Sequence, residues 1–527
     1  MSKPVTRREF LNLIAASSGT AAVLRVGAAL GIMPAVAMAG TPNLLHLNAD
    51  KRKVVILGAG LSGLAVAYEL TKAGYDCTVL EASHRPGGRI FTVRAGTLID
   101  EIGNPQRCEF DDEPHMYFNA GAARIPSTHS NTLHYCKELG VELQIFINEN
   151  KTAYVQDDNM FDGKPIRNGQ LTTSTRGFMA ELMAKGFDAA QIDQRFTDEE
   201  AEQMIALIRS YGDLDVNNRF SGSGRVDYAG NVEIDYLGLH SPQREMLNIR
   251  DLLKTNAMRQ VLRDNEGETG PLLMTPVGGM DKIPYAFARE LGNKVKLRAL
   301  VRSVTVKDSG VDVVYSQDGQ EHLIEADYCF NCIPTHLMTG IKNNFPAEYI
   351  QSMKLIRRGV AFKGAFQAKE RFWEEENIYG GISWTNQPIR QIWYPSHGIH
   401  KAKGVVLAAY DYGTGMHFTR MTQAERIEAM LAQGEKVHPH YRNLVEKGIT
   451  IAWHRMDHML GCSARWGQMT PESEAAYSML QNSLQGRHFY IGDQISRHSA
   501  WMESALQSAH FSMAEMDRQV RAEVASA

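Results

Sequence analysis

The chain has 527 residues, of which 43% are hydrophobic and 22% are charged, and its formal net charge is -4. This length predicts one large unit or two to three interleaved domains, because a single compact core rarely grows so large. The small net charge and the lack of a basic run argue against nucleic acid or an anionic membrane as a partner. Six scattered cysteines are too few for a disulfide framework, and the sequence carries no metal-binding motif.

The first 39 residues differ in character from the rest of the chain. Arg7 and Arg8 precede an apolar stretch rich in Ala, Leu and Gly that ends in small residues at Ala39. This pattern predicts a twin-arginine export signal over 1–39 and a periplasmic or secreted location, or a cytoplasmic one if the segment is not processed. An amphipathic N-terminal helix is the alternative, and Arg25 makes the segment a poor membrane span.

A dinucleotide-binding unit is predicted next. Its parts are a strand over 54–57, the motif Gly58-x-Gly60-x-x-Gly63, a helix over 64–72 and a strand over 77–80 that ends at Glu81. In such a βαβ unit the glycines and the N-terminus of the helix approach a pyrophosphate. Glu81 is expected to accept hydrogen bonds from the ribose hydroxyls.

The residues that follow indicate which dinucleotide to expect. They read EASHRPGGRIFT, with a pair of glycines between Arg85 and Arg89. This segment resembles the E-A-x-x-R-x-G-G-R motif of the flavin-dependent amine oxidase superfamily, which implies FAD. The sequence has no second G-x-G-x-x-G motif, which counts against a nicotinamide site and favours dioxygen as the electron acceptor.

The resemblance covers nearly everything after Asp50. It implies an α/β flavoprotein like the amine oxidases and glutathione reductase, with a Rossmann-type FAD-binding domain, a β-rich substrate domain and a helical insertion. We expect the FAD-binding domain over 50–106, 270–342 and 446–515, the substrate-binding domain over 107–165 and 343–445, and the helical domain over 166–269. A capping box from Thr197 to Glu200 predicts one helix of the insertion.

The resemblance also implies the residues that contact the cofactor. Arg85 and Arg89 would meet the pyrophosphate and the flavin edge, and the backbone of Val301 would meet the adenine. The family usually has Glu at position 493 and Gly at position 500, where this chain has Asp and Ala. The full expected set is Gly58, Gly60, Ser62, Gly63, Glu81, Ala82, Arg85, Gly88, Arg89, Ala122, Ala123, Arg124, Val301, Gly492, Asp493, Trp501 and Met502.

Three cysteines need an interpretation. Cys329 and Cys332 form a C-x-x-C pair, but they lie in an apolar strand that runs into a proline, which favours buried thiols over a redox pair. Cys462 lies close to the position where monoamine oxidases attach flavin covalently. The surrounding sequence differs from theirs, so we expect FAD to be held without a covalent bond.

The substrate residues follow from two further likenesses. The stretch NAGAARIP resembles the G-P-M-R-I/L-P segment of L-amino acid oxidases, in which the arginine, here Arg124, clamps the substrate carboxylate. A buried guanidinium needs an anion, and its planar fork matches a carboxylate. Tyr410 would donate to the same carboxylate, and Lys363 corresponds to the family's lysine that holds a water near the flavin. Tyr412, Ala500 and Trp501 complete the expected substrate site.

These features predict oxidation of L-amino acids by dioxygen to 2-oxo acid, ammonia and hydrogen peroxide, broad for neutral side chains. An amine or polyamine oxidase, an amino-acid 2-monooxygenase and a non-catalytic flavin-binding redox partner stay open as alternatives. We expect a homodimer without a stable membrane anchor or a metal. The sequence identifies neither a general base nor the preferred side chain.

Overall fold

The structure is a computed structural model that describes residues 42–47, 52–187, 196–226, 234–235, 238–239, 244–254, 269–412 and 416–526. The predicted export signal over 1–39 lies outside these residues. None of the described helices combines the length and the apolar character that a bilayer crossing requires.

A five-stranded parallel sheet forms the first body, with strand order β14-β2-β1-β18-β27. Its strands come from three distant parts of the chain, as the sequence predicts for the FAD-binding domain. They are β1 (Lys53–Leu57), β2 (Asp76–Leu80), β14 (Val295–Lys296), β18 (Tyr328–Asn331) and β27 (His488–Tyr490). Parallel strands of this kind are covered on both faces, which explains why the run over 54–57 is apolar throughout.

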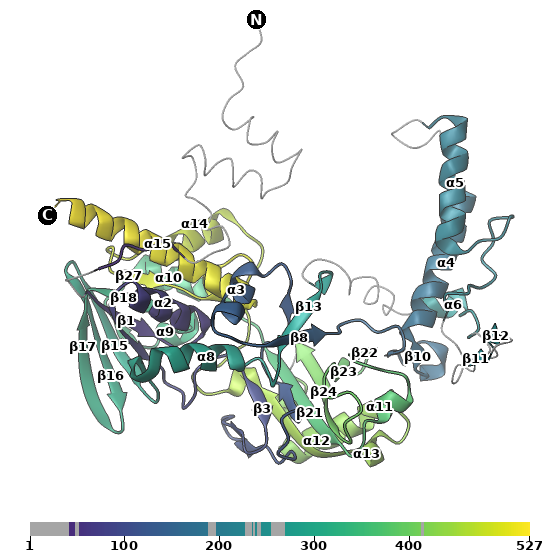
Figure 1. Ribbon diagram of the computed structural model, residues 1–527, viewed down its shortest axis with the longest axis horizontal. Coiled ribbons are helices and arrows are strands. Elements are labelled where there is room, and N and C mark those ends of the chain that lie inside the picture. The colour runs from purple at the N-terminus through teal and green to yellow at the C-terminus, as the bar shows by residue number, and fades with distance from the viewer. Residues whose placement is uncertain are drawn as a thin grey trace, which may run out of the picture.

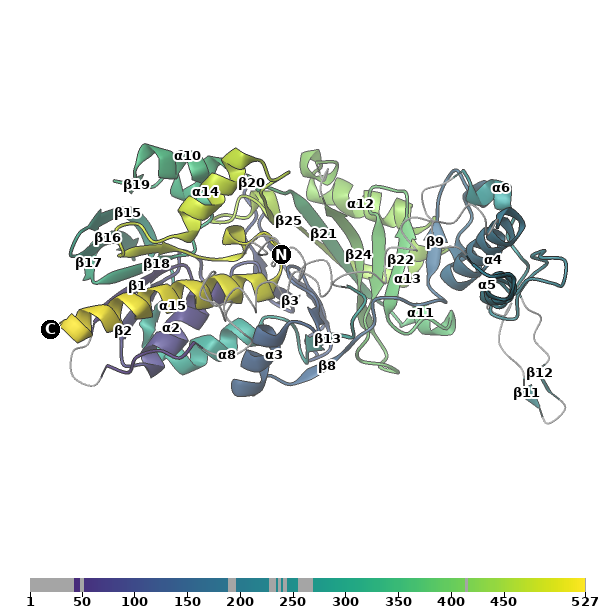
Figure 2. The ribbon, with the colours of Figure 1, turned by 90° about the horizontal axis from the view of Figure 1, so that it is seen from above.

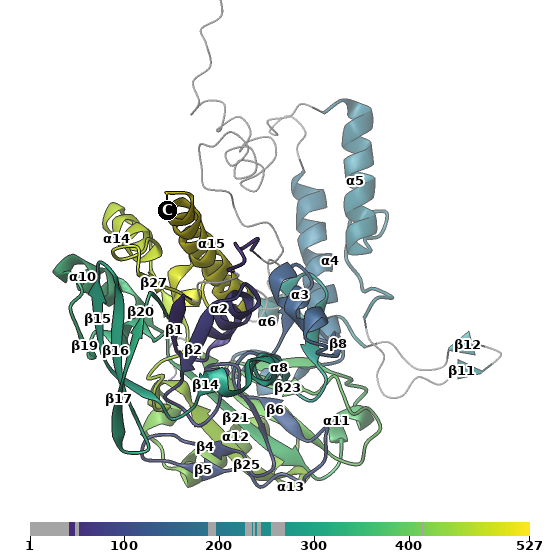
Figure 3. The same cartoon turned by 60° about the vertical axis from the view of Figure 1, so that its left-hand side comes forward.

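Each face of this sheet has its own hydrophobic core. Val54 and Ile56 of β1 pack with α2 (Leu61–Lys72), α8 (Lys282–Leu291), α3 (Ser130–Glu138) and α15 (Met502–Ser526). Val55 and Leu57 face β15 (Leu300–Lys307), β16 (Gly310–Gln317), β17 (Gln320–Ala326), α10 (Ala347–Leu355) and α14 (Pro471–Gln481). Figure 3 shows α2 and β15 to β17 on opposite sides of β1.

A seven-stranded sheet forms the second body, in the order β10-β9-β22-β23-β24-β21-β25. Figure 2 shows it between the parallel sheet and the helical insertion. Its strands are β9 (Tyr154–Gln156), β10 (Ile166–Arg167), β21 (Ala361–Ala368), β22 (Gly381–Thr385), β23 (Gln391–Tyr394), β24 (Gly404–Tyr412) and β25 (Val445–Ala452). This arrangement gives the β-rich body that the sequence predicts.

The predicted domain limits differ from the sheets at several places; β10, for example, begins the stretch predicted for the helical domain but pairs with β9 of the seven-stranded sheet. β25 pairs with β21, so residues 446–452 join the seven-stranded sheet and not the parallel one. Helix α10 packs beside α14 over the parallel sheet, although it lies in the stretch predicted for the substrate domain. α10 is a helix inside a stretch predicted as part of the β-rich substrate domain, and neither it nor β25 carries a sequence pattern that specifies which sheet it joins.

The helical insertion projects from the body (Figure 1), and its helices α4 (Asn168–Gly186) and α5 (Asp198–Gly212) lie side by side in Figure 3. It also contains α6 (Ile249–Leu252) and the strand pair β11 (Ile234–Asp235) and β12 (Gly238–Leu239). The predicted capping box is confirmed, because Thr197 accepts from the backbone of Glu200 and the Glu200 carboxylate accepts from the backbone of Thr197.

The remaining α-helices and β-strands lie outside the two large sheets. They are β3 (Thr92–Arg94), β4 (Leu98–Ile99), β5 (Gln106–Arg107), β6 (Tyr117–Asn119), β7 (Ile125–Pro126), β8 (Leu143–Phe146), β13 (Leu273–Pro276), β19 (Lys342–Asn343), β20 (Arg357–Arg358), β26 (Ala464–Arg465), α9 (Thr335–Met338), α11 (Phe372–Glu375), α12 (Gln423–Gly434) and α13 (Tyr441–Leu444).

Candidate active site

A cavity of about 720 Å³ extends from the carboxyl ends of β1 and β2 to the seven-stranded sheet. Its position fits the rule that parallel sheets bind ligands beyond the carboxyl ends of their strands. Nearly all the predicted site residues line it. They are Gly58, Gly60, Ser62, Glu81, Ala82, Gly88, Arg89, Ala122, Ala123, Arg124, Val301, Lys363, Tyr410, Tyr412, Gly492, Asp493, Ala500, Trp501 and Met502.

Two predicted cofactor residues, Gly63 and Arg85, do not line the cavity. A Cβ on Gly63 would lie 2.2 Å from the Gly58 carbonyl oxygen, so this glycine lets α2 pack closely against the preceding loop. The Arg85 guanidinium lies over the Phe91 ring at 3.8 Å and donates to the Gly88 carbonyl at 2.8 Å. Arg85 therefore supports the loop of Gly87 and Gly88, which we call the double-glycine loop, and does not line the cavity.

At one end of the cavity, the glycine motif leaves space in which a phosphate group would fit. No heavy atom lies within 4 Å of a Cβ built on Gly60, which is the N-cap of α2. No side chain caps this helix, so the N–H groups of its first turn are available to an anion at the cavity wall. Glu81 is buried beside them, and its carboxylate accepts from the backbone of Ala59 at 2.7 Å and of Ser83 at 2.8 Å.

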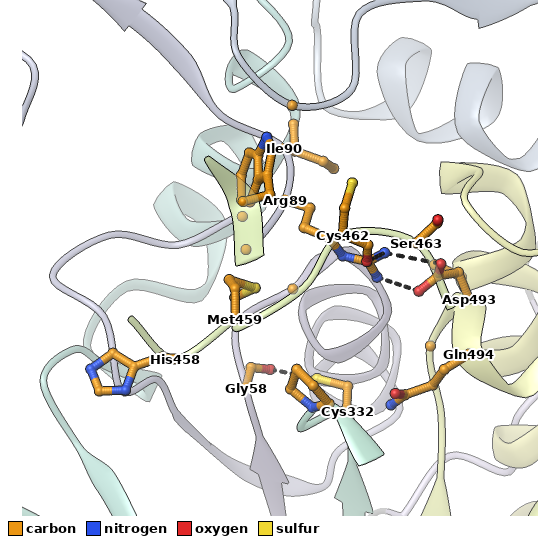
Figure 4. Close-up of a pocket in the computed structure, with 18 of the residues that line it drawn as sticks. Gly58, Arg89, Ile90, Cys332, His458, Met459, Cys462, Ser463, Asp493 and Gln494 are labelled. Atoms are coloured by element: carbon orange, nitrogen blue, oxygen red, sulfur yellow. Dashed lines mark hydrogen bonds and ion pairs between the residues drawn. The ribbon is translucent and has the colours of Figure 1, made fainter. Parts of the chain in front are cut away.

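Arg89 and the buried Asp493 form an ion pair across the middle of the cavity, in which the Arg89 side chain stays 31% exposed (Figure 4). The Arg89 guanidinium also donates to the Cys462 carbonyl at 2.8 Å, and Asp493 accepts from the backbone of Ala500 at 3.0 Å. Burial favours a neutral Asp493, but Arg89 outweighs it and holds the pKa of this carboxyl below its usual range. The pair thus ties the double-glycine loop to the segment that precedes α15.

Arg358 is a cavity residue that sequence reasoning missed. Its guanidinium donates to the Gln494 side chain, and its buried Nε has no hydrogen-bond partner. Burial and the nearby Arg89 lower the pKa of Arg358 to about 10. A buried cationic donor with an unused N–H indicates an anionic occupant. No motif marks Arg358, because its position depends on the pairing of β20 with β26.

The charges of the residues that line the cavity also favour an anionic ligand. Cationic side chains outnumber carboxylates among the lining residues, with Arg89, Arg124, Arg302, Arg358, Arg465 and Lys363 against Glu81, Asp457 and Asp493. The bare N-terminus of α2, the open Gly60 and the unpaired Arg358 Nε together fit a long ligand that carries a pyrophosphate.

Lys363 lies at the other end of the cavity, on β21. Its side chain is 2% exposed, and its ammonium donates to the carbonyls of Asn119 at 3.0 Å and Gly121 at 2.7 Å. Burial lowers the pKa of Lys363 to about 7; Cys462 acts against this shift and Arg124 adds to it. The amine also lies 4.6 Å from the centre of the Tyr410 ring. Lys363 is therefore a fixed, buried amine that changes charge near neutral pH.

Arg124 enters the same end from the loop before β7. Its guanidinium donates to the Asn148 side chain and lies over the Trp393 ring at 5.2 Å. The ring of Trp393 meets that of Tyr410 at 5.5 Å, and Tyr410 meets Tyr412 at 5.1 Å. The structure thus brings the predicted carboxylate-binding pair, Arg124 and Tyr410, to one pocket with Lys363. Sequence reasoning missed Asn148 and Trp393, which no motif marks.

The small residues before Arg124 are required by packing. A Cβ on Gly121 would lie 1.7 Å from the Arg89 carbonyl oxygen, so only glycine fits there. Ala122 donates its backbone N–H to the same carbonyl at 3.2 Å. The run of small residues therefore lets the Arg124 loop lie directly on the double-glycine loop.

Ala500 and Trp501 form a further part of the cavity lining. Ala500 has φ +75, a left-handed conformation that favours glycine, which is the residue the family usually has there. The Trp501 ring meets the edge of His129 at 5.0 Å and stacks on His498 at 6.4 Å.

The cysteines are free thiols, as predicted. Cys329 is buried in β18. Cys332 reaches the cavity, and its sulfur lies 3.0 Å from the carbonyl oxygens of both Leu57 and Gly58, which share its single S–H donor. Burial raises the pKa of Cys332 to about 12, which argues against a redox role. Cys462 also lines the cavity.

A family model described as flavin containing amine oxidoreductase matches residues 61–512. The chain belongs to this family. A flavin-dependent L-tryptophan oxidase of Lentzea aerocolonigenes is 25% identical over 490 residues, 88% of this chain and 97% of that protein. An L-amino-acid oxidase of Siganus canaliculatus is 27% identical over 483 residues, 88% of this chain and 85% of that protein.

Solved structures confirm the fold. A cyclohexylamine oxidase from Brevibacterium oxydans aligns with a TM-score of 0.60 at 15% identity, over 90% of this chain and all of that one. A putrescine oxidase aligns with a TM-score of 0.56 at 17% identity, over 91% of this chain and all of that one. The family gives FAD as the cofactor, and the pyrophosphate features of the cavity fit it.

Proposed function

We propose that the protein oxidises L-amino acids with dioxygen and water to 2-oxo acids, ammonia and hydrogen peroxide. The observation that carries this proposal is the convergence of Arg124, Tyr410 and Lys363 on one end of the cavity. A simple amine substrate has no carboxylate, so the Arg124 guanidinium and the Tyr410 hydroxyl would have no group to bind on it. The names of the L-amino-acid and L-tryptophan oxidase relatives support the same substrate class.

The cofactor and the protein have separate tasks in this reaction. FAD, when bound, accepts two electrons from the substrate's Cα–N bond and passes them to dioxygen. The first turn of α2, Arg89 and Arg358 would hold its pyrophosphate half. Cys462 lines the cavity, but we propose that FAD is held non-covalently.

The substrate is held by its carboxylate. The Arg124 fork would pair with both carboxylate oxygens, and the Tyr410 hydroxyl, whose pKa burial raises, would donate to one of them. Trp393 and Trp501 would exclude water around the Cα carbon. The imine that leaves is then hydrolysed to the 2-oxo acid and ammonia. These residues act by orientation, which is worth several orders of magnitude in rate.

A peroxide screen tests the proposal directly. The purified flavoprotein is assayed in a peroxidase-coupled reaction with the twenty L-amino acids and with putrescine and cyclohexylamine. Peroxide and 2-oxo acid in equal amounts from amino acids support the proposal. Peroxide from the amines alone makes the protein an amine oxidase, an amide product without peroxide makes it a monooxygenase, and no turnover makes it a flavin carrier.

We further propose that residues 1–39 direct export by the twin-arginine route. That route carries proteins that fold with their cofactor before export, which suits a flavoenzyme. A homodimer is the expected oligomeric state, and size-exclusion chromatography with light scattering measures it.

A further inference from the structure

We infer that Glu503 is a positioning residue that fixes the separation between the two sides of the substrate end of the cavity. We define the arginine wall as residues 122–126 and the tryptophan wall as residues 500–502. The inference rests on the proposed function, because it concerns the residue that fixes the geometry in which an amino-acid substrate is bound. Glu503 itself does not line the cavity.

The arginine wall leads directly into helix α3. Arg124 is followed by β7, and the backbone of His129, the N-cap of α3, donates to the Pro126 carbonyl at 2.9 Å. No side chain at the N-cap position satisfies the first turn of this helix. The first N–H groups of α3 therefore need an acceptor from elsewhere in the chain.

Glu503 supplies that acceptor from far along the sequence. One carboxylate oxygen accepts from the backbone and side-chain nitrogens of Asn131, at 3.1 and 2.7 Å. The other accepts from the backbone and the hydroxyl of Thr132, at 2.9 Å each. The carboxylate is 6% exposed and lies at the positive end of the helix. It thus caps α3 with four hydrogen bonds.

The same residue belongs to the tryptophan wall's helix. Glu503 is in the first turn of α15, directly after Met502, and Figure 1 shows the beginning of α15 beside α3. The Trp501 ring meets the ring of His129, the N-cap of α3, at 5.0 Å. On its other side the wall is tied by the bond from the Ala500 backbone to Asp493. The bonds to α3 therefore determine where Trp501 lies relative to Arg124.

Only a carboxylate can make all four bonds. A glutamine at position 503 has one acceptor oxygen, and its amide N–H groups would face two of the donors. Glu503→Gln should therefore let the two walls move apart without removing a group that touches substrate. A displacement of about 1 Å in a positioning element can cost about 100-fold in kcat/KM, and the part of that loss that is weaker substrate binding raises KM.

The test compares Glu503→Gln with Asp517→Asn in the full-length holoenzyme. Asp517 is also a buried carboxylate of α15, and it binds the Leu45 backbone at 2.6 Å, away from the cavity lining. Both variants should lower Tm and keep bound FAD. We expect Glu503→Gln to raise KM for amino acids by roughly tenfold or more, and Asp517→Asn to leave it unchanged. Equal KM values in both variants would overturn the inference.

The variants Thr132→Val and Glu503→Asp test the same contact by smaller changes. If Glu503→Gln does not fold, Thr132→Val removes one of the four donors and should still raise KM, whereas an unchanged KM overturns the inference. Glu503→Asp retains the charge and should give an effect between the parent and the glutamine variant. A parent protein that oxidises no amino acid refutes the proposed function instead, and this control is run first.

Discussion

Replacing Lys363 by methionine separates the two halves of the proposed reaction. Methionine keeps the length and the apolar stem of lysine but removes the ammonium, which is held by the carbonyls of Asn119 and Gly121 in a 2% exposed position. Dioxygen gains negative charge as it accepts electrons, and a fixed cation stabilises such charge without reorganising. Removing one preorganised donor of this kind costs about 100- to 1,000-fold in rate.

Because burial lowers the pKa of Lys363 to about 7, the rate of flavin reoxidation should also depend on pH. The amine is charged below that pH and neutral above it, because burial lowers its pKa. The oxygen half-reaction of the parent should therefore slow as pH rises through about 7, and the variant should be slow at every pH. Anaerobic reduction by substrate should change little, because Arg124 and Tyr410 set the substrate's position.

Stopped-flow absorbance of the bound flavin measures both half-reactions separately. Lys403→Met is the matched control, because Lys403 forms surface ion pairs with Asp111 and Glu446. The control should reoxidise at the parent rate. If Lys363→Met also reoxidises at the parent rate, Lys363 is a structural lysine and the reasoning is refuted.

Three other predictions concern stability, the cofactor and export. Ala500→Gly should raise the free energy of unfolding by about 1 kcal/mol, because alanine is strained at φ +75; a lower Tm would contradict this. Acid precipitation should release FAD into the supernatant, whereas yellow colour that stays in the pellet would indicate a covalent bond, for which Cys462 is the candidate. Export in a host with a twin-arginine system should fail when Arg7 and Arg8 both become lysine, and an equal periplasmic yield would refute the signal.

Local features were predictable from the residues themselves, whereas the meeting of distant segments at the cavity was predictable only where the family resemblance supplied it. The βαβ unit was recognised because its glycines and its acid are close in sequence, although α2 begins at Leu61 and not at 64. The third glycine and Arg85 were expected at the cofactor, but neither lines the cavity: a Cβ on Gly63 would collide with the Gly58 carbonyl oxygen, and Arg85 donates to the Gly88 carbonyl. Asn148, Arg358 and Glu503 were missed since their partners lie 24 to 372 residues away.

The central claim is that Arg124 makes the protein specific for a carboxylate. The measurement is kcat/KM for L-leucine and for 3-methylbutylamine, which lacks only the carboxylate, in the parent and in Arg124→Ala. Losing a charge-assisted pair costs about 1.5–3 kcal/mol, or roughly ten- to more than a hundredfold. We predict that loss for leucine alone, with normal FAD content and with little change for the amine. An Arg124→Ala variant that keeps the parent's preference for leucine over the amine would contradict the account.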